Sequence, residues 1–243
     1  MENKAVLLDY RASDEIVSSI EAIGLKVIRT CMCDKLSLPV NGHPDLMYHK
    51  ISDEFACIAP NCFEYLINEF AKNKELLKGK VFVKGKTSLG EIYPEDISYN
   101  ILRIGNLAFG KISSIDIRLR RALEHEGVEL VNIKQGYAKC SVAVTSKDSA
   151  ITSDKGVLTA LEKRGINVLF LEPGGIDLPG YDYGFIGGAS GFINDKFLLT
   201  GKFAKVGYNE RIESFVSLRA MAAQAKPHWI QSACLWAQHS SRG

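Results

Sequence analysis

The phrase Gly-His-Pro-Asp places His43 two positions before Asp45. If the phrase opens a β-strand, period-2 alternation puts His43 and Asp45 on one face, with a carboxylate beside an imidazole. Such a pair can bind a cation and move a proton. The alternative is a surface turn in which Asp45 caps backbone amides and His43 faces solvent. The phrase is therefore a candidate acid–base and cation-binding site.

A cysteine later in the chain is the candidate nucleophile. Cys140 begins an apolar alternation with Val142 and Val144, a pattern that favours a buried and inert thiol. Gly136 and Tyr137 come just before it and indicate a tight entry, which would put Cys140 at an exposed strand mouth. A catalytic thiol also needs a lowered pKa or an adjacent base, and a sequence displays neither.

Further polar residues could line the same site. In the segment 99–106, a strand would turn Asn100 and Arg103 toward it, whereas the apolar positions of the segment also fit a helical turn. The sequence leaves these two interpretations open. Arg11 is interpreted as a solvated loop arginine, with a ligand contact as the alternative.

The glycine-rich segment 174–191 follows a predicted strand. A dinucleotide-binding turn must open a helix, but residues 192–199 predict a hairpin, so a nucleotide cradle is not expected. The glycines instead favour close backbone approach, to another strand or to a small ligand. Asp182 is the nearest carboxylate to such a ligand.

The elements that must position these side chains follow a repeated pattern. The segments 122–133 and 160–171 each predict an amphipathic helix that ends at a glycine and leads into a β-branched strand. Glycine suits this position because it adopts φ > 0 without a Cβ clash, and the apolar run after it is typical of a buried strand. The pattern recurs at residues 14–28 and 62–83. The four helix-ending glycines are Gly24, Gly79, Gly127 and Gly165.

Pairs of strands precede most of these helices. The predicted pairs lie at residues 45–51 and 55–59, within 99–109, at 135–144 and 150–152, and at 183–186 and 196–200. The last pair leads to a helix over residues 210–219, which lacks the glycine expected near Ala220. The sequence therefore predicts an α/β fold of five strand-strand-helix-strand units, the last unit incomplete.

Length and composition fit a single domain over residues 1–220. The 243 residues can bury a sizeable core, and 46% hydrophobic with 24% charged residues argue against disorder. A net charge of +2 with scattered lysines and arginines indicates no nucleic-acid-binding face. No apolar run reaches membrane-spanning length and the start lacks the features of a signal peptide, so a cytoplasmic protein without a membrane partner is expected.

The six cysteines are expected to be reduced thiols, because no export signal accompanies them. Cys31-x-Cys33 is a weak metal signal: zinc needs four ligands, and no second pair with suitable spacing follows. We interpret Cys31 and Cys33 as two loop thiols and expect neither a metal nor a cofactor.

The last residues differ in character from the rest. From Met221 onward the chain continues Ala-Ala-Gln-Ala-Lys-Pro-His-Trp and ends Ser-Ser-Arg-Gly, with nothing that continues the fifth unit's final strand. This change is typical of a foreign or frameshifted segment. Residues 221–243 are therefore left out of the functional argument.

The five units, the Gly-His-x-Asp phrase and a cysteine two units later together resemble the pentein fold. This is the fivefold α/β-propeller of guanidino-group-modifying enzymes, such as arginine deiminase, agmatine deiminase, dimethylarginine dimethylaminohydrolase and the amidinotransferases. The phrases Gly-His-Pro-Asp, Lys-Gln-Gly-Tyr-Ala-Lys-Cys-Ser and Tyr-Gly-Phe-Ile-Gly-Gly-Ala-Ser-Gly also resemble an uncharacterised bacterial branch of that superfamily. The architectural resemblance covers residues 5–219.

The resemblance implies roles for individual residues. His43 matches the family's proton-transferring histidine, Asp45 matches the carboxylate that grips the guanidinium, and Cys140 lies in the unit of the nucleophilic cysteine. Asp182 is assigned by position as the remaining carboxylate, because no Glu-Gly-Gly-Asp phrase is present. The approach to the cysteine differs from the family pattern: Gly-Gly-x-x-His-Cys is replaced by Gln-Gly-Tyr-Ala-Lys-Cys.

The resemblance implies a hydrolase or amidinotransferase that acts on a small cationic guanidino or amidino compound through a covalent cysteine intermediate. The alternative is a noncatalytic pentein that binds a small ligand or a macromolecular partner, as the ribosome anti-association factor of this fold does. A Rossmann-like redox enzyme is a third interpretation, opposed by the missing helix after Gly191. The sequence does not indicate an oligomeric state.

Overall fold

The computed structural model describes residues 5–178, 180–193, 196–203, 205–223 and 227–229 of the chain. These residues divide into two compact units, which extend to residue 137 and from residue 138 onward. Each unit has a hydrophobic core of its own.

The first unit opens with a two-stranded parallel sheet, β1 (Ala5–Leu8) and β2 (Lys26–Arg29), joined by α1 (Asp14–Ala22). Ser13 caps α1 by accepting a hydrogen bond from the backbone N–H of Ile16, which satisfies one of the free amides at the helix start. The helix buries an Ile16–Ile20 stripe at the i, i+4 spacing of an amphipathic helix.

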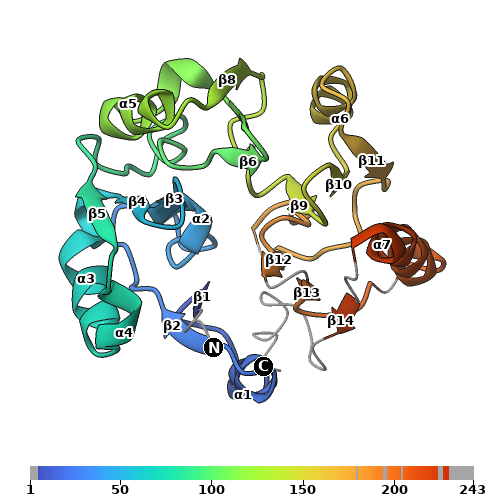
Figure 1. The fold of residues 1–243 in the computed structure, drawn as a ribbon, viewed down its shortest axis with the longest axis horizontal. Helices are drawn as coiled ribbons and strands as arrows, with labels where there is room; N and C mark the ends of the chain where they lie inside the picture. Colours follow the sequence, from blue (N-terminus) through green and yellow to red (C-terminus); the bar gives the residue numbers. More distant parts are fainter. Residues whose placement is uncertain (1–4, 179, 194–195, 204, 224–226, 230–243) are drawn as a thin grey trace. The chain divides into compact units, whose positions relative to one another are not determined.

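Two further sheets of the first unit share one order: an antiparallel strand pair, a helical segment and a parallel third strand. Figure 1 shows α3 and α4 beside the sheet β3-β4-β5. The helix α2 (Pro44–Met47) precedes the second sheet. The elements of that sheet and its helices are β3 (Tyr48–Lys50), β4 (Phe55–Ile58), η1 (Pro60–Cys62), α3 (Phe63–Ala71), α4 (Lys74–Leu77) and β5 (Val81–Lys84). Those of the third are β6 (Leu102–Ile104), β7 (Leu107–Gly110), η2 (Ile112–Ser114), α5 (Ile117–His125) and β8 (Glu129–Asn132).

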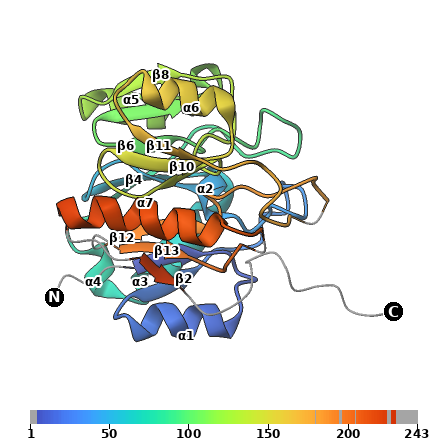
Figure 2. The same ribbon diagram turned by 90° about the vertical axis from the view of Figure 1, so that its right-hand side faces the viewer.

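The second unit repeats this order twice. Figure 2 shows α7 lying along β12 and β13, and side chains of α7 and β13 share one core, with Ile212 and Val216 against Phe197 and Leu199. The elements are β9 (Val142–Val144), β10 (Ser149–Thr152), α6 (Lys155–Glu162), β11 (Asn167–Phe170), β12 (Ser190–Ile193), β13 (Lys196–Leu199), α7 (Tyr208–Ala223) and β14 (Pro227–Trp229).

The predicted repeat is present, with differences at both ends of the chain. Four of the five sheets have three strands, whereas the described residues of the first sheet supply two. The prediction that nothing after residue 221 continues the last unit was wrong, because β14 pairs in parallel with β13. The other residues of the predicted tail, 224–226 and 230–243, lie outside the described residues.

The helix-ending glycines behave as predicted. Gly24, Gly79, Gly127 and Gly165 all have positive φ, between 69° and 83°. The segment 99–106, for which strand and helix both fitted, contains β6, which begins at Leu102 and forms a hairpin with β7. A strand predicted at residues 183–186 is absent, and β12 supplies the partner of β13 instead.

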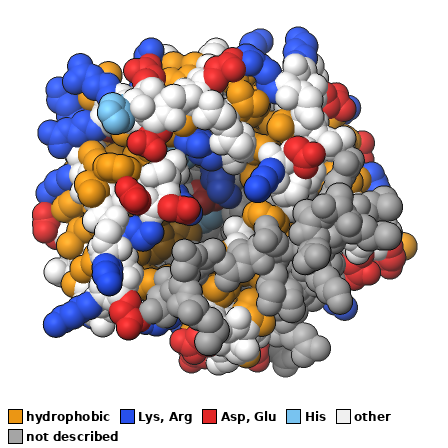
Figure 3. All heavy atoms as spheres, viewed as in Figure 1, with side chains coloured by type: hydrophobic (Ala, Val, Ile, Leu, Met, Phe, Trp, Pro, Cys, Tyr) orange, Lys and Arg blue, Asp and Glu red, His pale blue; other side chains and the backbone are white. Residues whose placement is uncertain are grey.

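The surface shows mixed charge. On the face drawn in Figure 3, lysine and arginine side chains are scattered among aspartates and glutamates. Among the described residues, no helix combines the length and the apolar character that crossing a bilayer requires.

Candidate active site

His43 and Asp45 lie at the start of a short helix in the first unit. The strand placement predicted for them was wrong: His43 is the N-cap residue of α2, with φ −72° and ψ 117°, and Asp45 lies in its first turn. Pro44 begins the helix because its fixed φ suits the first helical position. The lack of an N–H costs nothing there, since an N–H at this position would have no acceptor within the helix. Four residues are too few for a periodic signal, so the sequence pattern could not show this helix.

The helical turn still brings the two side chains together. The Nε2 of His43 lies 3.7 Å from the Oδ2 of Asp45, and the two side chains are 8% and 21% exposed. Leu46 and Met47 anchor the helix, because both are fully buried in the core of this unit. The arrangement gives a nearly buried imidazole a carboxylate partner, which stabilises the imidazolium whenever His43 is protonated.

Asn100 supports the same turn. Its Nδ2 donates a 3.3 Å hydrogen bond to the backbone carbonyl of Asp45, and the residue is completely buried. Asn100 also precedes β6, where its own backbone N–H donates to the carbonyl of Ile97. Asn100 therefore holds the main chain of the turn that carries Asp45.

Arg103 forms hydrogen bonds with the backbone around the hairpin in which it lies. Its guanidinium donates to the carbonyl of Ile51, at the end of β3, and to the carbonyl of Gly105, in the β6-β7 turn. Burial lowers the pKa of Arg103 from its usual value. Its Nε is buried without a hydrogen-bond partner in the described part of the chain. Both of these hydrogen bonds go to backbone carbonyls and not to the side chains of His43 and Asp45.

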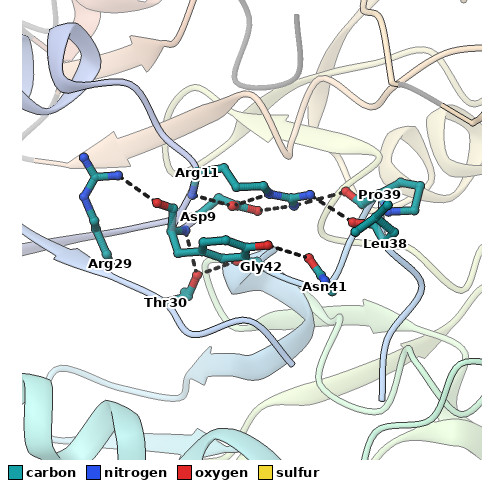
Figure 4. Close-up of polar contacts among 9 residues, drawn as sticks. Asp9, Arg11, Arg29, Thr30, Leu38, Pro39, Asn41 and Gly42 are labelled. Atoms are coloured by element: carbon teal, nitrogen blue, oxygen red, sulfur yellow. Dashed lines mark hydrogen bonds and ion pairs between the residues drawn. The ribbon is translucent and has the colours of Figure 1, made fainter. Parts of the chain in front are cut away.

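Sequence reasoning missed Asp9, a buried carboxylate directly after β1. The side chain of Asp9 is 4% exposed and receives both Nε and Nη2 of Arg11, at 2.8 and 2.7 Å, as Figure 4 shows. Arg11 also donates to the carbonyls of Leu38 and Pro39. Arg11, interpreted as a solvated loop arginine, is thus an ion-pair partner that fastens the loop 31–43. The sequence did contain one signal for Asp9: it is a charged residue directly after an apolar strand, where a buried carboxylate needs a partner.

The loop that ends at His43 is held against the first sheet. A Cβ at Gly42 would lie 2.5 and 2.6 Å from the carboxylate oxygens of Asp9, so only glycine fits against that carboxylate. The hydroxyl of Thr30 donates a 2.5 Å hydrogen bond to the carbonyl of Gly42. The hydroxyl of Tyr10 donates to the side chain of Asn41. The ends of β1 and β2 therefore set the position of the residue next to His43.

Cys140 lies in the second unit, in a turn that precedes β9. The strand begins at Val142, so the predicted alternation from Cys140 onward starts two residues too early. The residue is 4% exposed. Its carbonyl accepts a 3.2 Å hydrogen bond from the N–H of Gly188. The described structure gives the thiol no exposed strand mouth.

The glycine-rich segment makes the close backbone approach that its composition predicts. A Cβ at Gly187 would collide with the carbonyl oxygens of Lys139, Cys140 and Val142. Gly187 and Gly188 thus pack directly on the turn that carries the cysteine. Asp182, the carboxylate proposed by position, is exposed in the loop between β11 and β12.

Comparisons with known proteins agree with this architecture. Residues 7–226 match the model of a family of unknown function, DUF6873. No curated protein matches the chain.

Among solved structures, a mutant of DDAH from Pseudomonas aeruginosa, complexed with citrulline, is similar with a TM-score of 0.56 and 11% identity over 95% of this chain and 92% of that one. SxtG, an amidinotransferase from Microseira wollei in the saxitoxin biosynthetic pathway, is similar with a TM-score of 0.53 and 15% identity over 89% of this chain and 73% of that one.

At identities this low, structural similarity shows a shared fold but not a shared reaction. Both structures are penteins, in agreement with the resemblance inferred from the repeats and the Gly-His-x-Asp phrase. The chain has the pentein fold and belongs to the DUF6873 family.

Proposed function

We propose that the protein is a cysteine-dependent enzyme that breaks a C–N bond of a guanidino or amidino compound, as a hydrolase or an amidinotransferase. The observation that carries the proposal is the His43–Asp45 pair, a nearly buried imidazole 3.7 Å from a carboxylate. The pentein fold adds support, because the similar solved structures include a DDAH and an amidinotransferase. The proposed location is the cytoplasm.

The proposal includes a specific arrangement of the repeats. The five units would close into a fivefold α/β-propeller over residues 1–220, in a single domain. The chemistry requires that the thiol of Cys140, the imidazole of His43 and the carboxylate of Asp45 reach one substrate carbon. Closure of a propeller is the means by which such distant residues would meet at a common axis.

The first chemical step would form a C–S bond. A guanidinium is planar, cationic and a poor electrophile, so carboxylates must hold it with its central carbon facing the thiolate. Asp45 would provide one such contact and Asp182 is proposed for a second, while Asn100 would hold the turn of Asp45. The Cys140 thiolate would then attack the carbon and give a tetrahedral adduct.

The second step would break the C–N bond. His43, as imidazolium, would donate its proton to the departing amine, and the adduct would collapse to a thiouronium on Cys140. In a hydrolase, neutral His43 would then take a proton from water as the water attacks the same carbon. The C–S bond would break, returning the thiolate and releasing a ureido product. In an amidinotransferase, an acceptor amine would replace the water.

A noncatalytic pentein is the second candidate. The observation in its favour is Lys139, which stands directly before Cys140 where the family pattern has histidine. The enclosed turn of Cys140 also fits a structural thiol, because a buried cysteine behaves as a small hydrophobe. In this case Asp45 would bind a ligand without a covalent step, and Arg103 would act only through the hairpin.

A turnover assay separates the two candidates. The purified chain is incubated with a panel of guanidino compounds, and ammonia, free amine and ureido product are measured, with and without an acceptor amine. An enzyme releases amine in amounts above the protein concentration, and Cys140→Ala abolishes the release. Binding of a guanidino compound by calorimetry without turnover, unchanged in Cys140→Ala, would support the binding protein and reject the enzyme.

A further inference from the structure

A carboxylate that the proposed mechanism does not use is buried in the first unit. Asp96 is 4% exposed and follows directly after the exposed loop 91–95. Its Oδ2 accepts a hydrogen bond from the hydroxyl of Tyr137. Its Oδ1 is also buried and has no hydrogen-bond partner among the residues that the structure describes. One oxygen of this carboxylate therefore lacks the partner that a buried polar atom ordinarily has.

The missing partner matters because a charged carboxylate is costly to bury without a counter-charge. Burial is the largest cause that raises the pKa of Asp96, and the neighbouring carboxylate of Glu95 acts in the same direction. The hydroxyl of Tyr137 and the backbone N–H of Asp96 oppose this rise without cancelling it. Within the described part of the chain, no lysine or arginine forms an ion pair with Asp96. A cation from outside these residues would complete its environment.

Two tyrosine rings belong to the same cluster. The ring of Tyr137, whose hydroxyl reaches Asp96, is tilted against the ring of Tyr93, with the two centroids 6.1 Å apart. The Nζ of Lys111 lies 4.6 Å from the centroid of Tyr93, so this ring already has an ammonium group at its face. Aromatic faces attract cations through the negative potential of their π-systems. The cluster thus combines a carboxylate oxygen without a partner and two rings that favour positive charge.

The backbone packs closely enough to bring these groups together. A Cβ at Gly136 would lie 2.6 Å from the ring of Tyr93 and 2.7 Å from the Cδ1 of Ile97. The absence of a side chain at Gly136 therefore allows the segment before Tyr137 to contact both residues. The turn that follows Asp96 is closed by the N–H of Asn100, which donates to the carbonyl of Ile97. The positions of the carboxylate and the rings thus follow from main-chain packing.

We propose that Asp96, Tyr93 and Tyr137 form a binding site for a primary alkylammonium ion. The ammonium would donate to the Oδ1 of Asp96 in a charge-assisted hydrogen bond, and its alkyl part would lie against the tyrosine rings. Because Oδ1 itself is covered, the ligand would enter by a movement of the loop 91–95, whose residues are all exposed.

The site uses none of the residues to which the proposed reaction assigns a role. It lies within the first unit, and ammonium binding there requires neither the thiol of Cys140 nor the imidazole of His43. A binding measurement therefore tests the ammonium site even if no turnover is ever found. Equally, failure of the ammonium site would leave the proposed reaction standing.

The test is an NMR titration of the full chain, with isotope-labelled tyrosine rings, by n-propylammonium chloride at constant ionic strength. We expect saturable shifts of the ring signals of Tyr93 and Tyr137, which are identified by their loss in Tyr93→Phe and Tyr137→Phe. Tetramethylammonium chloride is the matched probe, because it has the same charge but no N–H group. It should bind at least about tenfold more weakly, since it cannot donate to Asp96.

Variants assign the binding to the carboxylate. Asp96→Asn keeps the size of the side chain and an acceptor for Tyr137 but removes the charge, so the affinity for n-propylammonium should fall at least about tenfold. Glu95→Gln is the matched control, because Glu95 is the adjacent carboxylate and is exposed. It should bind n-propylammonium with an affinity within about twofold of wild type.

A second variant keeps the test decisive if Asp96→Asn does not fold, which circular dichroism shows. Tyr137→Phe leaves the carboxylate in place but removes its hydrogen bond from the hydroxyl, and it should weaken binding less than Asp96→Asn does. Unchanged affinity in either folded variant would overturn the proposal. Equal affinity of the wild-type protein for the two cations, or shifts that do not saturate, would overturn it as well.

Discussion

His43 and Asp45 are paired by one turn of helix, and their separation of 3.7 Å is short enough for the carboxylate to steady an imidazolium. If His43 supplies the proton to a departing amine, its removal must slow turnover far more than it weakens substrate binding. We predict that His43→Ala lowers kcat by roughly 10²–10⁴-fold, the usual range for a general acid–base residue. Steady-state kinetics on any substrate found in the turnover assay measures this.

The control for that variant is His125→Ala. His125 ends α5 and its side chain is 88% exposed, so its loss should leave kcat unchanged. Equal losses in the two variants, or a His43→Ala enzyme that differs only in KM, would remove His43 from the proton transfer.

Asp9 illustrates a residue that positions others. Its carboxylate is buried, receives two N–H groups of Arg11 and lies against Gly42, the neighbour of His43. We predict that Asp9→Asn lowers the free energy of unfolding by about 1–3 kcal/mol, because the bidentate acceptor is lost in a buried setting. Urea unfolding measures the change.

Asp14→Asn is the matched control for Asp9→Asn. Asp14 also pairs with an arginine, Arg29, at 3.0 Å, but its side chain is 100% exposed. An exposed ion pair contributes little to stability, so this variant should be close to wild type. The assignment of Asp9 as an anchor would be wrong if both variants unfolded at the same urea concentration.

At the scale of elements, Asp116 connects a helix to a loop of the preceding sheet. Its Oδ1 accepts from the N–H groups of Arg118 and Leu119 at the start of α5, and its Oδ2 accepts from those of Lys86 and Thr87 after β5. Burial disfavours the charged form, but the backbone N–H groups outweigh this effect and lower the pKa of Asp116.

The lowered pKa of Asp116 gives stability a defined pH dependence. Because the folded pKa lies below the unfolded one, the contribution is complete above the unfolded pKa, about 4, and is lost as the pH falls through the folded pKa. We predict that Asp116→Asn costs about 2–4 kcal/mol at neutral pH and that the difference from wild type shrinks in acid.

Urea unfolding of wild type and Asp116→Asn across this pH range makes the comparison. Asp154→Ala serves as the control, because the Asp154 carboxylate caps α6 by accepting from the N–H of Val157. Its loss should cost only about 0.5–2 kcal/mol. A pH-independent gap between wild type and Asp116→Asn would contradict the role of the charged form.

Gly127 shows what the repeated helix ends require. It has φ 69°, and nothing lies within 4 Å of the place that a Cβ would occupy. A side chain here would therefore lower the stability through backbone strain and not through a clash. We predict that Gly127→Ala costs about 1 kcal/mol, measured by urea unfolding. Gly191→Ala is the control, because Gly191 also has open space around it but no positive φ. Equal effects would mean that backbone conformation is not what selects glycine here.

At the scale of the whole molecule, repetition made most of the architecture predictable. Helices with an apolar stripe, a glycine stop and an apolar strand are local signals, and Gly127 and Gly165 display them at matching positions. What escaped prediction depends on contacts between distant segments or on very short elements. The four-residue helix after His43 has no measurable period, and β14 exists through its pairing with β13.

The candidate site was predictable only in part, for the same reason. His43 and Asp45 were found because they are neighbours in sequence, although a helix rather than a strand pairs them. The contact of Asp9 with Gly42 arises from the meeting of segments about thirty residues apart, and no local pattern encodes that. The apolar alternation at Cys140 suggested a strand where the chain forms a turn.

The measurement that tests the central claim most directly compares two alkylating reagents on the intact protein. Chloroacetamidine carries the charge and shape of the proposed substrate, whereas chloroacetamide is its neutral counterpart. Peptide mapping of all six cysteines after each reagent gives the rate at every site. A carboxylate-lined guanidinium site predicts that chloroacetamidine modifies Cys140 ahead of the other five cysteines, and that chloroacetamide shows no such preference. Labelling of Cys140 that is absent, or equal for both reagents, would contradict it.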